Sequence, residues 1–189
     1  MGLNIVMVEP EIPQNTGNVA RLCAATGTRL HLVRPFGFRL DSRHMKRAGL
    51  DYWEFVDVVI HDSLSEFMTS FSDAAGAEAE AEVGGRRGRG EREGCGERFF
   101  LATTSGNRSY HEVAYRDGDY ILFGAESRGL PKELLWSNPD ATIRIPMASQ
   151  CRSLNVANSA AIVLYEALRQ LHFPKLVPGM DRQEPHEGY

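Results

Sequence analysis

Six short apolar runs recur along the chain, and helix-type or polar segments separate them. Runs that lack a polar residue at every second position are typical of strands covered on both faces, as in parallel sheets. Their alternation with helices predicts an α/β domain that has a mostly parallel sheet with helices on both faces. The predicted strands are LNIVMV (3–8), LHLV (30–33), FVDVVI (55–60), FFLATT (99–104), YILFG (120–124) and TIRIP (142–146).

Helix signals lie between these strands. A helix is expected over about residues 16–26, because Gly27 is suited to end it. The stretch SLSEFMTSF begins with Ser63 and has Glu66 three residues later, which is the capping-box pattern. The last helix is expected over about residues 155–172, before a proline.

The length and the cysteines limit the class of protein. A chain of 189 residues fits one domain, large enough for a core without disulfides or metal. Cys23, Cys95 and Cys151 are widely spaced and form no CxxC pair, which indicates free thiols and no zinc site. No apolar stretch approaches the ~18 residues of a membrane span, and no basic leader precedes an apolar run. These features predict a cytoplasmic protein with neither metal nor membrane.

Charge is unevenly distributed. The net charge of −4 argues against a protein that coats nucleic acid along its whole surface, but it permits a local basic patch. In FRLDSRHMKRAGL (38–50), a helix would place Arg43, Lys46 and Arg47 on one face. This pattern fits a solvated helix face and a phosphate-binding patch equally well.

One segment interrupts the alternation. Residues 74–97 are rich in Gly, Glu and Arg, and Val83 is their single large apolar residue. Such a composition cannot bury enough apolar surface to offset the entropy of ordering, so we predict a flexible surface insertion. The GRRGRG core of this segment could contact RNA, but such a composition alone is weak evidence, so a spacer is favoured. The domain then spans residues 1–177, with the insertion at 74–97 and a disordered tail at 178–189.

Three predicted strand ends carry unusual polar residues, and ligands of open α/β sheets bind at the carboxyl ends of strands. Taken singly, Asn15 and Thr16 fit a helix cap, and Gly124 and Gly129 fit turns. Either Ser153 or Asn155 fits the N-cap of the last helix. Glu126 and Arg128 are harder to explain in this way, because they are charges placed directly after a buried strand. The three stretches are EPEIPQNTGNVAR (9–21), FGAESRGLP (123–131) and IPMASQCRSLNVANSAA (145–161).

Common nucleotide-binding and hydrolase motifs are absent: there is no GxGxxG after the first strand, and no GxxxxGK[ST] or GxSxG. In order and position, the three stretches resemble the three motifs of the SPOUT-class RNA 2′-O-methyltransferases. EPEIPQNTGNVARLCAATG, RAGLDYWEF, DGDYILFGAESRGLP and IPM…RSLNVANSAAIVLYEALRQL are similar to the branch that methylates the wobble cytidine or uridine of tRNA. The resemblance covers residues 3–173 apart from the insertion.

The resemblance implies a single SPOUT-type domain whose C-terminal part forms a trefoil knot, a connection that general folding rules would not suggest. It implies S-adenosylmethionine as cofactor, the tRNA anticodon stem-loop as substrate, and a homodimer with its active site near the subunit interface. Small residues in the last helix permit close packing at such an interface, and a core contact explains them equally well. These residues are Ala157, Ala160 and Ala161.

The resemblance also implies two sets of site residues. The active-site set is Asn15, Arg21, Glu126, Ser153 and Asn155. The cofactor's adenine is expected at main-chain groups near Ala102, Gly124, Ile145 and Ser153.

Methyl transfer to a ribose hydroxyl requires alignment of the oxygen and stabilisation of its developing negative charge. Asn15 would then orient, and Arg21 would face an RNA phosphate or the nascent alkoxide. Because an arginine side chain keeps its proton, we assign Arg21 electrostatic stabilisation rather than general-base catalysis. On a helix, Arg21 shares a face with Asn18.

Two other functions fit part of this pattern. The same fold methylates ribosomal RNA or other tRNA positions in larger relatives that carry an added RNA-binding domain, for which this chain is short. A non-catalytic knotted RNA-binding dimer is disfavoured because Arg21, Glu126 and Asn155 are all present.

Overall fold

The fold was analysed in a computed structural model, which describes residues 2–39, 55–71, 98–174 and 176–177. Three predictions fall outside these residues: the basic helix face around 43–47, the insertion at 74–97 and the tail at 178–189.

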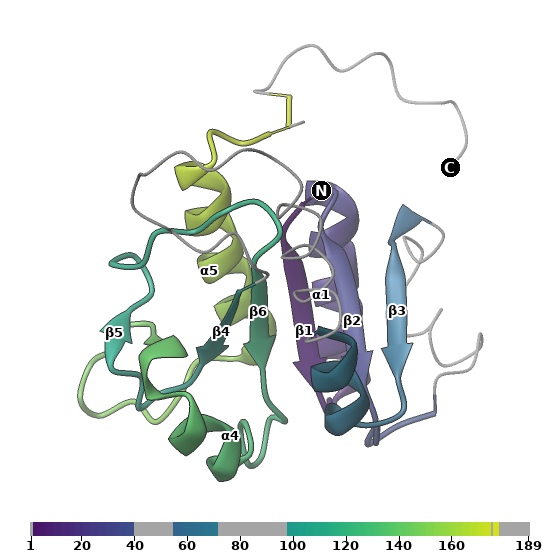
Figure 1. Cartoon of the computed structure of the whole chain (residues 1–189), viewed down its shortest axis with the longest axis vertical. Coiled ribbons are helices and arrows are strands. Elements are labelled where there is room, and N and C mark those ends of the chain that lie inside the picture. Colours follow the sequence, from purple (N-terminus) through teal and green to yellow (C-terminus); the bar gives the residue numbers. More distant parts are fainter. Residues whose placement is uncertain (1, 40–54, 72–97, 175, 178–189) are drawn as a thin grey trace, which may run out of the picture.

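The described residues form one seven-stranded sheet in which every neighbouring pair of strands is parallel. Its strand order is β3-β2-β1-β6-β4-β7-β5 (Figure 1). The predicted parallel α/β sheet is therefore confirmed. The strands are β1 (Asn4–Val8), β2 (Arg29–Val33), β3 (Val58–His61), β4 (Phe99–Ala102), β5 (Arg108–Ser109), β6 (Tyr120–Phe123) and β7 (Thr142–Arg144).

Helices cover both faces of this sheet (Figure 1). On one face, α1 (Pro13–Thr26) and α5 (Val156–Gln170) pack against side chains such as Ile5 and Met7 of β1. On the other face, helical residues 64–71 and α4 (Lys132–Ser137) cover Val6 and Val8 of the same strand. Alternate residues of β1 thus enter two separate cores, which explains why this strand is apolar from Ile5 to Val8.

Most predicted boundaries are close to those observed. α1 ends at Thr26, and Gly27 follows with a left-handed φ of 65°. It begins at Pro13 rather than near residue 16, since proline is suited to the first turn of a helix. One of the two hydrogen bonds of the predicted capping box before helical residues 64–71 is present: the Ser63 hydroxyl accepts the Glu66 N–H at 3.1 Å. The Glu66 carboxylate accepts the N–H of Asp62 rather than that of Ser63.

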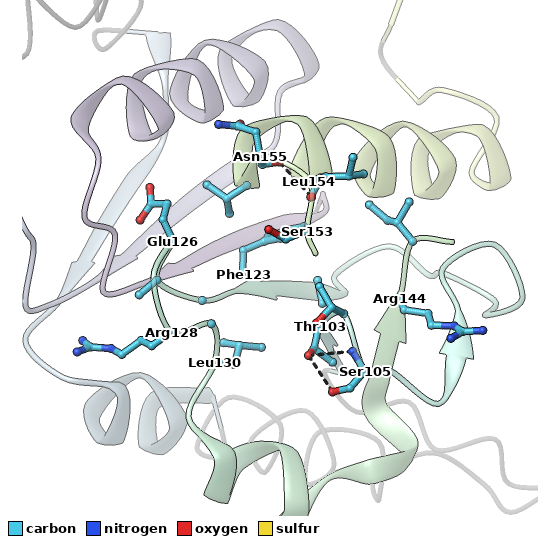
Figure 2. A pocket seen from close by; sticks show the side chains of 18 of the residues that line it. Thr103, Ser105, Phe123, Glu126, Arg128, Leu130, Arg144, Ser153, Leu154 and Asn155 are labelled. Carbon is cyan, nitrogen blue, oxygen red and sulfur yellow. Dashed lines mark hydrogen bonds between the residues drawn. The ribbon is translucent and has the colours of Figure 1, made fainter. Parts of the chain in front are cut away.

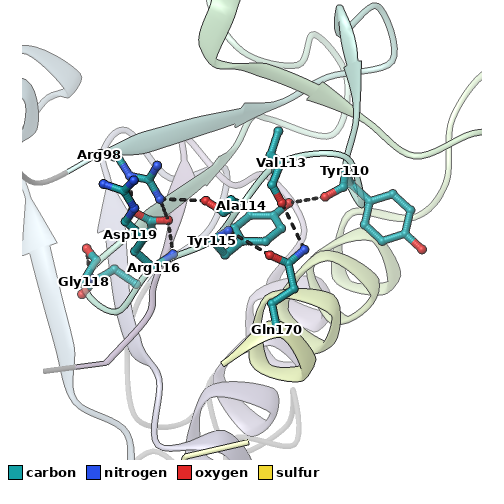
Figure 3. A network of polar contacts seen from close by, with 10 residues as sticks. Arg98, Tyr110, Val113, Ala114, Tyr115, Arg116, Gly118, Asp119 and Gln170 are labelled. Carbon is teal, nitrogen blue, oxygen red and sulfur yellow. Dashed lines mark hydrogen bonds and ion pairs between the residues drawn. The ribbon is translucent and has the colours of Figure 1, made fainter. Parts of the chain in front are cut away.

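A polar network fastens the segment between β5 and β6 onto α5 (Figure 3). The Tyr115 N–H donates to Gln170 Oε1 at 3.0 Å, and Gln170 Nε2 donates to the Val113 carbonyl at 3.0 Å. At the far end of the segment, Arg98 binds both carboxylate oxygens of buried Asp119, at 3.0 and 2.7 Å. The two bonds of Gln170 hold the C-terminal end of α5 against this segment.

The order of the strands differs from their order along the chain. From β4 the chain runs to β5, returns to β6 on the other side of β4, and then enters β7 between β4 and β5. This strand order requires the chain to cross β4 between β5 and β6 and to cross it again between β6 and β7. The trefoil knot itself stays a prediction.

Two histidines are buried between β2 and β3. His31 Nδ1 lies 3.0 Å from His61 Nε2, and the two rings stack beside Phe67. Burial, together with the nearby His61, lowers the pKa of His31 to about 4, and burial also lowers the pKa of His61. The other charged groups acting on the pair are Arg29, Asp57 and Glu66. Below the ordinary histidine pKa of about 6.5, the unfolded chain therefore binds more protons than the folded one.

We expect the free energy of unfolding to be highest above about pH 6.5 and to fall by about 2 kcal/mol or more between about pH 7.5 and 5. Urea titrations at both pH values measure this change. The His31→Gln variant, which removes one buried imidazole, should show a smaller pH dependence. An equal dependence in the variant would assign the effect to other groups.

The described part of the chain lacks a helix with the length and apolar character needed to cross a membrane. Within the same residues, no three His, Cys, Asp or Glu side chains are grouped as metal ligands. Of the described cysteines, Cys151 is exposed and Cys23 is buried. Burial raises the pKa of the Cys23 thiol to about 12, which makes it unreactive.

Candidate functional site

The carboxyl ends of four neighbouring strands, β1, β6, β4 and β7, meet at one edge of the sheet. The loops that follow them surround a cavity of about 740 Å³ (Figure 2). Glu126 and Asn155 lie toward one side of it, and Thr103 and Ser105 lie toward the other. This is the position at which open α/β sheets bind ligands.

Seven of the eight predicted site residues line this cavity. They are Asn15, Ala102, Gly124, Glu126, Ile145, Ser153 and Asn155. The exception is Arg21, which does not line it and lies on the exposed side of α1 with Asn18 and Ala25. The structure therefore brings together residues from all three motifs, and their individual roles stay predictions.

Glu126 binds the start of α1 from a distance of more than a hundred positions along the chain. Its carboxylate accepts the backbone N–H groups of Glu11 at 2.8 Å and Ile12 at 3.3 Å, and the side-chain amide of Asn15 at 2.8 Å. Ile12, the N-cap residue of α1, offers no side-chain cap of its own. Glu126 supplies the negative charge that a helix N-terminus favours.

Asn15 continues this chain of hydrogen bonds. Its side-chain oxygen accepts the Asn155 side-chain amide at 2.9 Å, so its own amide nitrogen faces Glu126. Asn155 in turn accepts the N–H of Ala157 at 2.9 Å and caps α5. Of the two candidate caps of the last helix, Asn155 rather than Ser153 is the one observed, and the interpretation of Asn15 as a cap is wrong. Asn15 lies inside the first turn of α1, where its buried side chain joins the first and third motifs.

A second pair of contacts, which the sequence did not indicate, runs in the opposite direction between the same two loops. The Glu11 carboxylate accepts the Ser127 N–H at 2.9 Å and the Ser127 hydroxyl at 2.7 Å, and these bonds lower the pKa of Glu11. Arg128 forms an ion pair with Glu9. Glu9 has a φ of 52°, an uncommon backbone conformation for a residue with a side chain. In the sequence, these contacts correspond only to two acids in EPEIP and to the adjacent Ser127 and Arg128 in a distant motif.

Gly124, directly after β6, has a steric role. A Cβ atom there would lie 2.0 Å from the carbonyl carbon of Gly129 and 2.1 Å from the nitrogen of Leu130. Gly129 closes this turn with a φ of 71° and donates its N–H to the Ala125 carbonyl at 2.8 Å. Both glycines are therefore required by the backbone of the turn, beyond any contact with a ligand.

The cavity has the size and the lining of a small-molecule site. Its volume falls within the roughly 300–1,000 Å³ of typical ligand pockets. Apolar side chains are available to hold a flat aromatic ring, and residues at the strand ends line the cavity beside them. The apolar lining includes Leu130, Ile143, Ile145, Met147 and Leu154.

The sequence matches the profile of the SpoU rRNA methylase family over residues 2–86 and 92–165. The chain belongs to this family. An Escherichia coli (strain K12) relative, the tRNA (cytidine(34)-2′-O)-methyltransferase, is 44% identical over 176 residues, which are 93% of this chain and 98% of the relative.

Two solved structures share the fold of this chain. One of them is a structure described in connection with the 2-OH methylation of C/U34 on tRNA. It matches with a TM-score of 0.74 and 45% identity, over 90% of this chain and 96% of that one. AviRb from Streptomyces viridochromogenes, solved with AdoMet, has a TM-score of 0.69 at 24% identity, covering 90% of this chain and 61% of that one. The predicted SPOUT-type α/β class is thereby confirmed for this SpoU methylase.

Proposed function

We propose that this SpoU methylase transfers a methyl group from S-adenosylmethionine to the ribose 2′-OH of the wobble nucleotide of tRNA, a pyrimidine or a modified uridine, in the cytosol. One observation supports this most strongly: the Glu126–Asn15–Asn155 chain of hydrogen bonds joins all three motifs at a single cavity. The near full-length identity to a tRNA (cytidine(34)-2′-O)-methyltransferase supports the choice of substrate.

The cavity fits the cofactor by its size, its apolar lining and the main chain at its strand ends. The groups that would hold the adenine are the main chains near Ala102, Gly124, Ile145 and Ser153. When bound, S-adenosylmethionine supplies a methyl group already activated by its sulfonium. The protein is then left with orienting the ribose hydroxyl and stabilising the charge that develops on its oxygen.

Within this function, Glu126 is a positioning residue. Its two carboxylate oxygens already accept three N–H groups, from Glu11, Ile12 and Asn15. Glu126 therefore holds Asn15 in place, and Asn15 with Ser153 and Asn155 lines the place where the ribose would bind.

We propose in addition that the enzyme is a homodimer whose interface includes α1 and α5. On α5, the exposed residues 158, 162, 165 and 169 form one stripe, which includes Ile162 and Tyr165. The adjacent α1 exposes Asn18 and Arg21 on a stripe of its own. The alanines offer less to an interface than expected, since Ala157 and Ala160 are buried in the core. A second copy on this face would cover the apolar side chains and bring Arg21 toward the partner's cavity.

Sedimentation at micromolar concentration should show a dimer, and Tyr165→Glu should shift the protein toward monomer, since it places a charge in an apolar interface. Ser137→Ala, an exposed change on α4, is the matched control. A wild-type protein that sediments only as monomer would count against the dimer.

The function itself is tested by incubating the protein with labelled S-adenosylmethionine and total tRNA, then mapping the modified nucleotide. We expect a single ribose-methylated wobble position in a subset of tRNAs. Label in ribosomal RNA or at another tRNA position would instead support a related methyltransferase. Binding of tRNA without any transfer would support a non-catalytic dimer.

A further inference from the structure

One wall of the cavity ends in an unusually exposed tryptophan. Trp136 lines the cavity from α4, and 72% of its surface is exposed. No ring contact joins it to another aromatic residue among those described. An indole left open to solvent beside a ligand cavity is a common feature of recognition surfaces.

Cations dominate the charged lining of this cavity. Its charged side chains are Glu126, Arg128, Lys132, Arg144 and Arg152. Glu126 is engaged by hydrogen bonds from the start of α1 and from Asn15, and Arg128 is paired with Glu9. Lys132, Arg144 and Arg152 form no ion pair with a carboxylate in the described part of the chain.

The acidic groups of this wall face elsewhere. Glu133 and Asp140 are exposed, and neither lines the cavity. The backbone carbonyl of Asp140 accepts a hydrogen bond from Arg108 at 2.7 Å, which adds another guanidinium to this side of the sheet. Arg144 extends from β7 at the opposite side of the cavity from Arg128 (Figure 2). Two of the three cations without an ion pair, Lys132 and Arg144, therefore come from α4 and β7.

We propose that Trp136, Lys132 and Arg144 form a stacking platform for an unpaired base of the RNA substrate, next to the nucleotide that enters the cavity. Unpaired RNA bases are commonly held on aromatic faces while cations contact the neighbouring phosphates. The inference rests on the proposed RNA methyltransferase function and adds a contact that selects a single-stranded loop over a duplex.

The adenine of the cofactor is the competing occupant of Trp136. The interior of the cavity already offers apolar side chains to a flat ring, among them the half-buried Ile145 and Met147. Leu135 of α4 is half-buried, whereas its neighbour Trp136 is mostly open to solvent. An exposed indole at the rim is better placed for a base that arrives with the RNA.

The test compares Trp136→Ala, Trp136→Phe and the neighbouring control Ser137→Ala. Binding of S-adenosylmethionine alone is measured by calorimetry, and binding of an anticodon stem-loop RNA is measured at several salt concentrations. We expect Trp136→Ala to weaken RNA binding by roughly 5- to 150-fold, the loss of one base stack, with cofactor affinity unchanged. Trp136→Phe should recover most of the affinity, and Ser137→Ala should behave as wild type.

Two further arms separate stacking from charge. An RNA with an abasic site beside the target nucleotide should bind wild type more weakly but should bind Trp136→Ala no worse than the intact RNA does. Lys132→Ala should reduce the slope of log affinity against log salt by about one, whereas Trp136→Ala should leave the slope unchanged.

Unchanged RNA affinity in Trp136→Ala would overturn the platform, and so would a loss confined to cofactor binding. Both affinities are measurable whether or not methyl transfer occurs. Transfer by the wild-type enzyme to the same stem-loop is scored separately, so failure of the proposed function is distinguishable from failure of the platform.

Discussion

Replacing Arg21 by alanine is expected to slow methyl transfer to tRNA by about 100- to 1,000-fold, the typical effect of removing one group that stabilises a developing oxyanion. Arg21 is exposed on α1 and does not line the cofactor cavity of its own subunit. Its loss should therefore change the free energy of unfolding by no more than about 0.5 kcal/mol. Cofactor affinity should also remain near that of wild type. Single-turnover kinetics, calorimetry with S-adenosylmethionine and urea titration measure the three quantities.

Two further variants separate the charge of Arg21 from its geometry. Arg21→Lys keeps the charge but lacks the planar fork, so we expect it to recover only part of the rate. Arg29→Ala removes another exposed arginine, one that pairs with Asp57 at the amino end of β2, and should leave the rate unchanged. Near-normal turnover by Arg21→Ala would remove Arg21 from the mechanism.

If Arg21 acts in the partner's cavity, two inactive variants should complement each other. Mixed dimers of Arg21→Ala with a cofactor-site variant would contain one cavity that has both an intact cofactor site and an intact Arg21. Activity that reappears on mixing would support the shared site. Inactive mixtures of correctly formed mixed dimers would place Arg21 in its own subunit's site.

Gly124→Ala is expected to have a large structural effect, because a Cβ atom at Gly124 would approach its neighbours more closely than one at any other described glycine. The new Cβ atom would lie 2.0–2.1 Å from the backbone of Gly129 and Leu130, which is far inside van der Waals contact. Because backbone atoms rather than a flexible side chain must move, the turn at residues 124–130 has to open. We expect a loss of about 1–3 kcal/mol of stability and at least about tenfold weaker binding of S-adenosylmethionine.

Gly2→Ala is the matched control for this change, because its Cβ atom would meet only the Gly27 carbonyl oxygen at an ordinary 3.6 Å. Thermal unfolding and calorimetry of the two variants give the comparison. A Gly124→Ala protein with wild-type melting temperature and cofactor affinity would contradict the close approach of Gly124 to Gly129.

The fold class followed from the sequence because the central strands of a buried parallel sheet consist mostly of apolar residues. Each of the six predicted strands is present, with β3 beginning later than expected, at Val58. The strand β5 was missed, since it is only Arg108–Ser109 and has no apolar pattern. Its pairing with β7 is a tertiary contact that local sequence does not encode.

The members of the site were easier to predict than their connections. Strand ends gave the places of Asn15, Glu126 and Asn155, because the carboxyl ends of parallel strands share one edge of the sheet. The bonds between them could not be predicted, since Glu126 caps a helix that begins far away in the chain. The contacts of Glu9 and Glu11 could not be predicted for the same reason, because their partners Arg128 and Ser127 are likewise remote in the chain.

The central claim, methylation of the wobble ribose, is tested most directly by changing one oxygen atom of the substrate. A tRNA with a 2′-deoxy nucleotide only at the wobble position should bind the enzyme but accept no methyl group. The same tRNA with the 2′-deoxy nucleotide one position further along should be methylated at a near-normal rate. Transfer of labelled methyl to the wobble-deoxy tRNA at the normal rate would contradict the account.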